Sequence, residues 1–144
     1  EHAELTSELL THDTLHLVVA ADSGVEDLAD AAHLPWVFEG EHNTSRVWAI
    51  DQCRAAGFEP QVRYVIDDLG THLQLAAAGA AAVLPGFALA NLARSAEADS
   101  VKVLPLPGEP KRKIFVTVRS ESAEQPAIKA VKEALQHAVN SAPR

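Results

Sequence analysis

The stretch that decides the fold class of this chain is Ala55–Pro85, AAGFEPQVRYVIDDLGTHLQLAAAGAAAVLP. Gly57 ends a preceding helix, and Val62–Ile66 has the β-branched and aromatic residues typical of a strand. A helical pattern follows and stops at Gly79. The uninterrupted apolar run Ala80–Leu84 then predicts a strand that is covered on both faces. This order of elements predicts a βαβ unit with a polar loop in its middle.

The residues upstream of this stretch continue the alternation of strands and helices. Leu15–Val19 predicts a strand, and Ser23 with Glu26 predicts a capping box that begins a helix. Leu34–Phe38 predicts a short buried strand, and a helix is expected over Arg46–Ala56.

Downstream, Phe87–Arg94 predicts a short helical or irregular piece and Val101–Leu106 an extended one. Lys111–Lys113 predicts an exposed basic turn. A strand follows, and then a helix with Pro126 in its first turn. The spacing of the helix's apolar residues predicts a buried stripe: Ile128, Val131, Leu135 and Ala138 or Val139. Strands alternating with helices predict an α/β fold with mainly parallel pairing, and such sheets bind ligands beyond the carboxyl ends of their strands.

Composition narrows the class of protein. The chain has 144 residues, enough for about one domain, and a net charge of −8, which disfavours binding to phosphate backbones or anionic membranes. No run of 18 apolar residues occurs, so no membrane span is predicted. The single cysteine, Cys53, excludes an internal disulfide, favours a reducing cytoplasm and predicts a small buried side chain. Because the chain begins at Glu1 and soon enters a strand, we interpret it as a fragment of a longer protein.

Two polar loops follow predicted strands, and each has two interpretations. His42–Ser45 precedes a helix and can hold an anionic group, or Thr44 or Ser45 can simply cap that helix. Asp67 and Asp68 can act as paired carboxylates, or one caps a helix while the other is solvated or bonds a neighbouring backbone amide. In either case the backbone of Ile66 and Asp67 is expected to face a ligand crevice.

The sequence offers no catalytic or metal-binding constellation. Its seven histidines lack the spacing of metal ligands, and no GxSxG, GxGxxG or GxxxxGK[ST] motif occurs. We therefore expect no metal, no cofactor and no enzymatic activity.

An ordered series of motifs resembles the effector-binding domain of LysR-type bacterial transcriptional regulators. The series comprises AGFEP after a helix, a strand ending in DDL, a helix ending in AAG, and a VLP-type strand. It extends upstream to LHLVV and DLADAAHLPWV, and downstream to VKVLPLPGEPKRKIFVTVRS and QPAIKAVKEALQHA, so that it covers nearly the whole chain.

The resemblance implies a periplasmic-binding-protein-like (type 2) fold of two α/β lobes, with lobe one incomplete in this chain. Residues 1–24 would be the end of lobe one and the first crossover, 25–85 would be lobe two, and 86–144 would be the second crossover and the return to lobe one. The effector would bind between the lobes. The effector-binding residues implied are Thr11, Thr14, His42, Asn43, Thr44, Ile66, Asp67 and Pro85.

The function implied is sensing of a small polar effector that controls DNA binding by an absent N-terminal helix-turn-helix domain. The resemblance also implies a cytoplasmic homodimer or tetramer, and Trp48 is a candidate for the dimer interface, with the core as the alternative. The alternative functions are a solute-binding protein of a transporter and a small α/β enzyme.

Overall fold

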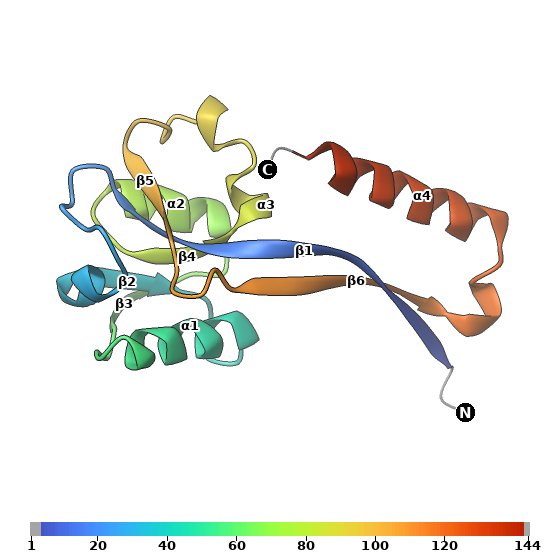
Figure 1. Ribbon diagram of the computed structural model, residues 1–144, viewed down its shortest axis with the longest axis horizontal. Coiled ribbons are helices and arrows are strands. Elements are labelled where there is room, and N and C mark those ends of the chain that lie inside the picture. Colours follow the sequence, from blue (N-terminus) through green and yellow to red (C-terminus); the bar gives the residue numbers. More distant parts are fainter. Residues whose placement is uncertain (1–3, 143–144) are drawn as a thin grey trace. The chain divides into compact units, whose positions relative to one another are not determined.

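Strand β1 (Leu5–Ala20) belongs to both of the compact units into which this chain divides. The computed structural model describes residues 4–142 (Figure 1). Unit 1 comprises residues 1–13 and 111–144, and unit 2 comprises residues 14–110. The expected division into lobes after residues 24 and 85 stays a prediction.

The strands of unit 2 pair in both directions. β4 (Ala82–Pro85) and β5 (Val101–Pro105) flank β1 and are both antiparallel to it. β2 (Pro35–Phe38) and β3 (Gln61–Val65) are parallel, and a parallel bridge joins Trp36 to Ala81 just before β4. The expectation of mainly parallel pairing is therefore wrong, because the direction in which β1 crosses the sheet depends on distant partners.

The helices of unit 2 follow the sequence signals closely, with one exception. α1 (Thr44–Ala55) is followed by Gly57 at φ 97°, and α2 (Leu69–Ala77) by Gly79 at φ 112°. Glycine adopts this left-handed backbone without steric cost, so both predicted helix stops are confirmed. The remaining helical segments before β5 are short: η1 (Ala29–His33), α3 (Gly86–Leu89) and η2 (Leu92–Arg94).

The helix predicted from Ser23 and Glu26 is the exception, since only the 3-10 turn η1 forms there. The Ser23 hydroxyl accepts a hydrogen bond from the Val25 amide, and Asp30 accepts bonds from the amides of Glu26 and Asp27. These local side-chain bonds occupy the amides of the expected first turn and favour a turn over a longer helix.

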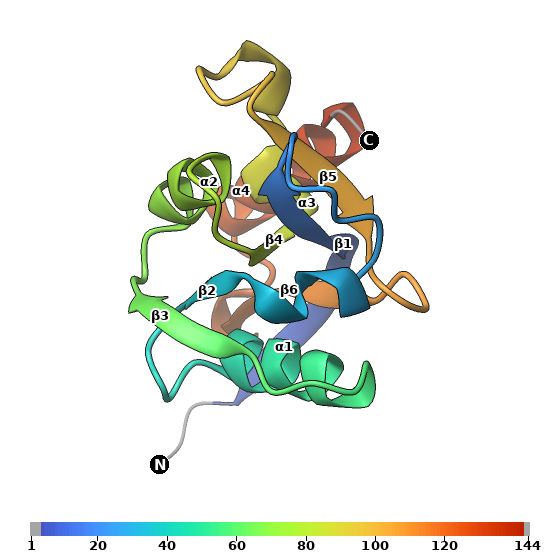
Figure 2. The same ribbon diagram turned by 90° about the vertical axis from the view of Figure 1, so that its left-hand side faces the viewer.

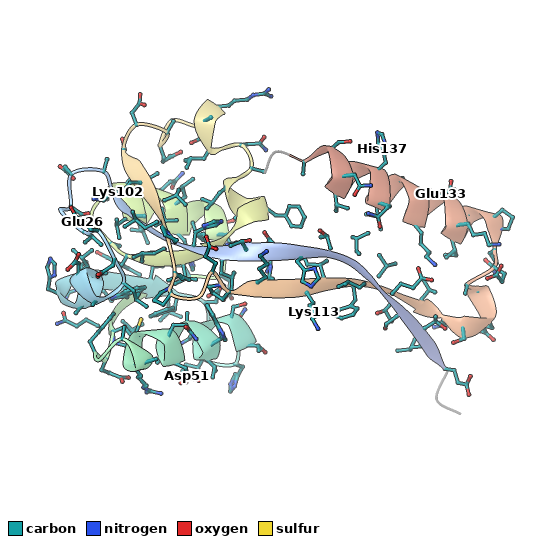
Figure 3. The ribbon with its side chains drawn as sticks, in the orientation of Figure 1. Glu26, Asp51, Lys102, Lys113, Glu133 and His137 are labelled. Atoms are coloured by element: carbon teal, nitrogen blue, oxygen red, sulfur yellow. The ribbon has the colours of Figure 1, made fainter. Side chains whose placement is uncertain are left out.

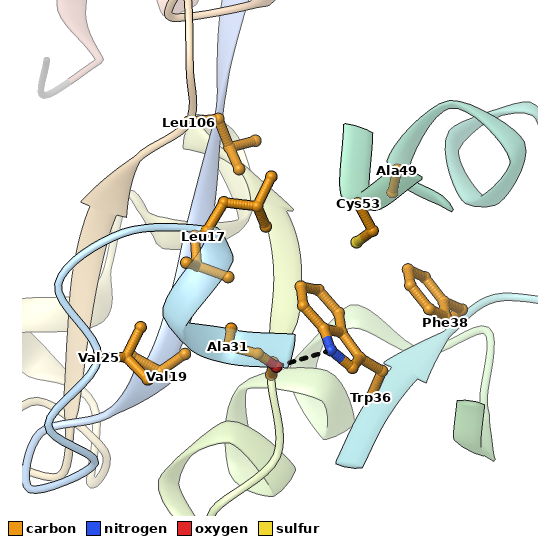
Figure 4. Packing of buried hydrophobic residues seen from close by; sticks show 11 residues of the cluster. Leu17, Val19, Val25, Ala31, Trp36, Phe38, Ala49, Cys53 and Leu106 are labelled. Atoms are coloured by element: carbon orange, nitrogen blue, oxygen red, sulfur yellow. Dashed lines mark hydrogen bonds between the residues drawn. The ribbon is translucent and has the colours of Figure 1, made fainter. Parts of the chain in front are cut away.

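Two apolar clusters lie on opposite faces of the unit 2 sheet, because successive residues of a strand point to opposite sides. On one face, Trp36 stacks on Phe38 with ring centroids 5.5 Å apart, and the Trp36 indole donates to the Ala31 carbonyl (Figure 4). On the other face, Val37 packs with Leu73 of α2. α1 and α2 therefore cover different faces (Figure 2).

Unit 1 is built from the first part of β1, β6 (Lys111–Arg119), the turn η3 (Ser120–Ser122) and α4 (Pro126–Ser141). β6 pairs with β1, and the side-chain bonds Thr6–Ser120 and Ser7–Thr117, each 2.7 Å long, show an antiparallel register. Lys111–Lys113 is exposed as expected, but it begins a strand and is not a turn.

The apolar stripe of α4 is not buried, contrary to the sequence prediction. Val131 is 58% exposed and Leu135 39% exposed, and Ile128 and Val139 are only half-buried. Within residues 4–142, unit 1 contributes only β6 and the first part of β1 as strands, and two strands offer too little surface to cover an amphipathic helix.

Candidate functional site

The polar loops that follow β2 and β3 lie side by side. Parallel strands end at the same edge of a sheet, and the Ile66 amide donates to the Phe38 carbonyl at 2.9 Å. One step farther along, the Gly40 amide donates to Oδ1 of Asp67 at 3.0 Å. These two bonds hold the loop after β2 against the start of the loop after β3.

The end of β4 lies at the same sheet edge. The parallel bridge between Trp36 and Ala81 gives β4 the direction of β2, so β4 also ends at this edge with Pro85. Leu15 pairs with Pro85, which places Thr14 of β1 beside it. The predicted site residues of unit 2 therefore share one edge, which we call the carboxyl edge, whereas Thr11 lies on β1 in unit 1.

The predicted site residues differ in their exposure. Those of the loop after β2, His42, Asn43 and Thr44, are exposed, as is Asp67. Thr11, Thr14 and Ile66 are half-buried, and Pro85 is buried. Pro85 can therefore shape the edge but offers little surface to a ligand.

Asn43 caps α1, and this corrects the expectation that Thr44 or Ser45 does so. The Asn43 side chain accepts a hydrogen bond from the Ser45 amide at 2.8 Å, while Thr44 and Ser45 are already inside the helix. Asn43 has the extended backbone that an N-cap position requires. Arg46, in the first turn, donates from Nη1 to the Glu39 carbonyl at 3.0 Å.

Asp68 caps α2, and Asp67 bonds the neighbouring Gly40 amide, so the interpretation of one cap and one amide-bonded carboxylate is confirmed. Oδ2 of Asp68 accepts from both the amide and the hydroxyl of Thr71, each at 2.8 Å. These hydrogen bonds stabilise the ionised form and lower the pKa of Asp68.

His72 is a buried residue of this edge that sequence reasoning missed. Its Nε2 bonds the Ile66 carbonyl, and its Nδ1 is buried without a hydrogen-bond partner in the part of the chain that the structure describes. The amide and the carbonyl of Ile66 each have a partner within the fold, and the role of Ile66 in effector binding stays a prediction. The sequence signal for this burial was the position of His72. It lies four residues after the Asp68 cap, on the inner side of α2.

Cys53 is buried, as predicted, and its thiol has low reactivity. Burial raises the pKa of its thiol to about 12, and the negative charge of Glu59 adds to this effect. The thiolate is the reactive form, so Cys53 is a poor nucleophile near neutral pH.

Within residues 4–142, no group of three or more histidine, cysteine, aspartate or glutamate side chains could hold a metal ion. No helix in that range is long and apolar enough to cross a membrane.

Trp48 of α1 is half-buried and packs against the cluster that contains Trp36. The neighbouring Val47 is 53% exposed. A part of the Trp48 side chain thus belongs to the core, and its role in a dimer interface stays a prediction.

Comparisons with known structures agree on the fold. The C-terminal domain of a probable LysR family regulator from Rhodococcus sp. RHA1 is 24% identical with a TM-score of 0.66, over 92% of this chain and 67% of that one. The CcmR regulatory domain of Synechocystis PCC6803, in complex with 2-PG, is 13% identical with a TM-score of 0.74, over 98% of this chain and 70% of that one. The LysR family regulator CbnR is 23% identical with a TM-score of 0.67, over 94% of this chain and 48% of that one.

These likenesses show the periplasmic-binding-protein-like type 2 fold, and the chain spans about half the length of CbnR. A comparison with curated protein sequences found no significant match. The family model for the LysR substrate binding domain matches residues 1–140, which is almost the entire sequence. The chain therefore belongs to the LysR substrate binding domain family.

Proposed function

We propose that this chain is the larger part of the effector-sensing domain of a LysR-type transcriptional regulator and that it binds a small polar molecule at the carboxyl edge of unit 2. The family match over residues 1–140 carries this proposal. The alternatives, a solute-binding protein of a transporter and a small α/β enzyme, are not favoured by a family whose members are regulators.

The arrangement of the carboxyl edge supports this location for the effector. Thr14, the loop after β2 and the loop after β3 come from distant parts of the sequence and converge there. The exposed hydroxyl of Thr44 and the half-buried side chain of Thr14 offer a ligand both donors and acceptors. We further propose, from the family resemblance, that Thr11 and a second lobe complete the site.

The charges at this edge favour a neutral or zwitterionic effector over a simple anion. Glu39, Glu41, Asp67 and Asp68 contribute four carboxylates. Arg46, in the first turn of α1, already donates to the Glu39 carbonyl. An anionic ligand would meet like charges here, whereas a ligand with an ammonium group would gain attraction.

The rest of the regulator is part of the same proposal. A chain with a net charge of −8 is a poor ligand for DNA, so DNA would be bound only by a separate helix-turn-helix domain. Full-length CbnR has been solved with its target DNA. A cytoplasmic homodimer or tetramer with Trp48 at its interface remains our expectation, on the basis of the family resemblance.

Thermal unfolding in the presence of three small-molecule panels tests the proposal: neutral polar compounds, zwitterionic amino acids and simple carboxylates. The test uses this chain and the full-length regulator. A ligand at 100 times its dissociation constant stabilises the folded state by about 2.7 kcal/mol, a readily measured shift. Stabilisation by the first or second panel is expected, and stabilisation by carboxylates alone would contradict the charge argument.

Two variants test whether an observed ligand binds at the carboxyl edge. Thr44→Val removes an exposed hydroxyl at the carboxyl edge and should weaken binding. Ser100→Ala removes an exposed hydroxyl at the opposite edge, beside Val101, which pairs with Ala20, and should leave binding unchanged. Equal effects of the two substitutions, or no ligand in any panel, would contradict the proposed site.

A further inference from the structure

The chain passes between its two units at two points only. β1 passes from unit 1 to unit 2 between Asp13 and Thr14, and the chain returns between Pro110 and Lys111. Any change in the relative orientation of the units must therefore be absorbed by a few backbone bonds near these two points.

An ion pair joins the two crossing segments immediately on the unit 1 side. Arg112 donates to Oδ2 of Asp13 from Nη2 at 2.9 Å and from Nε at 3.2 Å. The Asp13 side chain is 5% exposed and that of Arg112 is 41% exposed. A buried carboxylate that keeps its charge requires such a partner, and these two residues are 99 positions apart in the sequence.

On the unit 2 side, the same two segments are joined by the backbone. The Leu15 amide donates to the Pro110 carbonyl at 2.9 Å. The turn before this bond is stiff, because Pro107 and Pro110 flank Gly108 at φ 76° and Glu109 at φ 47°. A non-glycine residue in the left-handed region costs free energy and persists only where its surroundings hold it.

We propose that the Asp13–Arg112 ion pair is a hinge clamp, which makes the two crossing strands bend as one and so limits the range of orientations between the units. Without it, β1 and β6 would lose this side-chain link beside the crossing points, and the two crossings would be coupled less strongly. The clamp would thereby limit how far an effector can change the relative orientation of the units. This last step rests on the proposed function.

The two hydrogen bonds to one oxygen favour arginine over lysine at this position. Two nitrogens of one planar guanidinium donate to the same carboxylate oxygen, so two hydrogen bonds restrain the orientation of the guanidinium as well as its distance from Asp13. A lysine would keep the charge but would offer a single flexible ammonium. Arg112→Lys should therefore retain the attraction and lose the orientation.

The clamp can be tested by measuring distances between spin labels on the two units, with no effector present. Figure 3 shows Glu26 and Glu133, which are exposed side chains of unit 2 and unit 1, respectively. Glu26→Cys and Glu133→Cys are labelled in a Cys53→Ala background of the full chain. The distance distribution is then recorded by double electron–electron resonance.

Arg112→Gln should give a wider distribution than the parent chain, with Arg112→Lys between the two. Arg54→Gln is the matched control, because it breaks the exposed Arg54–Glu59 pair, which is 2.7 Å long and lies within unit 2. This control should leave the width unchanged.

The double variant Asp13→Asn/Arg112→Gln separates the clamp from simple destabilisation. Arg112→Gln alone takes the Arg112 cation away from a buried carboxylate and can impair folding, whereas the double variant removes both charges. A folded double variant, verified by circular dichroism, should still give a wide distribution. A parent-like width in that variant, or equal widening by Arg54→Gln, would overturn the clamp.

The result is independent of ligand binding. A widened distribution together with failure of every ligand panel would reject the proposed function and keep the clamp. An unchanged width together with ligand stabilisation would do the reverse.

Discussion

Oδ1 of Asp67 lies 3.0 Å from the backbone nitrogen of Gly40 and accepts its hydrogen bond across 27 residues of chain. This bond joins the loops that follow β2 and β3, so it fixes the carboxyl edge at which the effector is proposed to bind. Asp67 is thus a structural residue first, and any contact with a ligand must use the part of its carboxylate that this bond leaves accessible.

Removing this bond should loosen the edge. Asp67→Ala is expected to lower the free energy of unfolding by roughly 1 kcal/mol, the usual net contribution of one hydrogen bond. Asp67→Asn keeps a carbonyl oxygen that can accept the same bond and should cost less. Urea unfolding measures both. Gly40→Ala is the control, because its new Cβ would lie 3.6 Å from Oδ1 of Asp67, an ordinary contact. A larger loss for Gly40→Ala than for Asp67→Ala would contradict this reasoning.

The cap of α1 makes a second prediction. Asn43→Ala removes the acceptor for the Ser45 amide and should lower the free energy of unfolding by about 1 kcal/mol. Thr44→Ala and Ser45→Ala lie inside the helix and should change it much less, since neither side chain caps. Thermal unfolding of the three variants distinguishes them. Equal losses at Asn43 and Thr44 would restore the original expectation of a Thr44 cap.

The buried thiol of Cys53 should make the folded state less stable at alkaline pH. The pKa of its thiol is raised from 9.0 to about 12 in the folded state, so the folded chain binds this proton more tightly than the unfolded chain. Its contribution is therefore complete below pH 9.0 and is lost as the pH rises toward about 12. Denaturant unfolding between these limits should show a steeper decline for the parent chain than for Cys53→Ala. Identical slopes would show that Cys53 does not titrate differently in the two states.

Two leucines with different surroundings test the location of the core. Leu84 is completely buried, and truncating it to alanine should cost about 2–5 kcal/mol through lost burial and a cavity. Leu135 of α4 is 39% exposed, so Leu135→Ala should cost much less. The comparison is made by urea unfolding of this chain. A cost at Leu135 as large as that at Leu84 would mean that the stripe of α4 is covered in solution.

Local signals in the sequence were reliable wherever one residue or one short pattern determines the backbone. Gly57 and Gly79 end their helices because each adopts a left-handed backbone, which glycine does without steric cost. Asp68 caps α2 because an aspartate at that position can reach the amide three residues later. Where several polar residues competed for one role, as at Asn43, Thr44 and Ser45, the sequence could not choose, since all three types can cap a helix.

The candidate site was predicted only in part for the same reason. The two loops at the carboxyl edge follow from the order of the strands, and the structure brings them together as expected. The burial of His72 and its bond to the Ile66 carbonyl were not foreseen, because they depend on the angle at which α2 meets the sheet. That angle is set by packing between elements and has no local signal.

By itself, the sequence determined most of the order of the elements, the helix stops and a series of motifs specific enough to indicate the family. Only the tertiary structure decided the antiparallel pairing of β1 with β4 and β5, the exposure of the α4 stripe and the ion pair between Asp13 and Arg112. The physical reason is the range of the interactions. Propensities, caps and turns act over a few residues, whereas strand direction, burial and charge pairing depend on which distant segments meet.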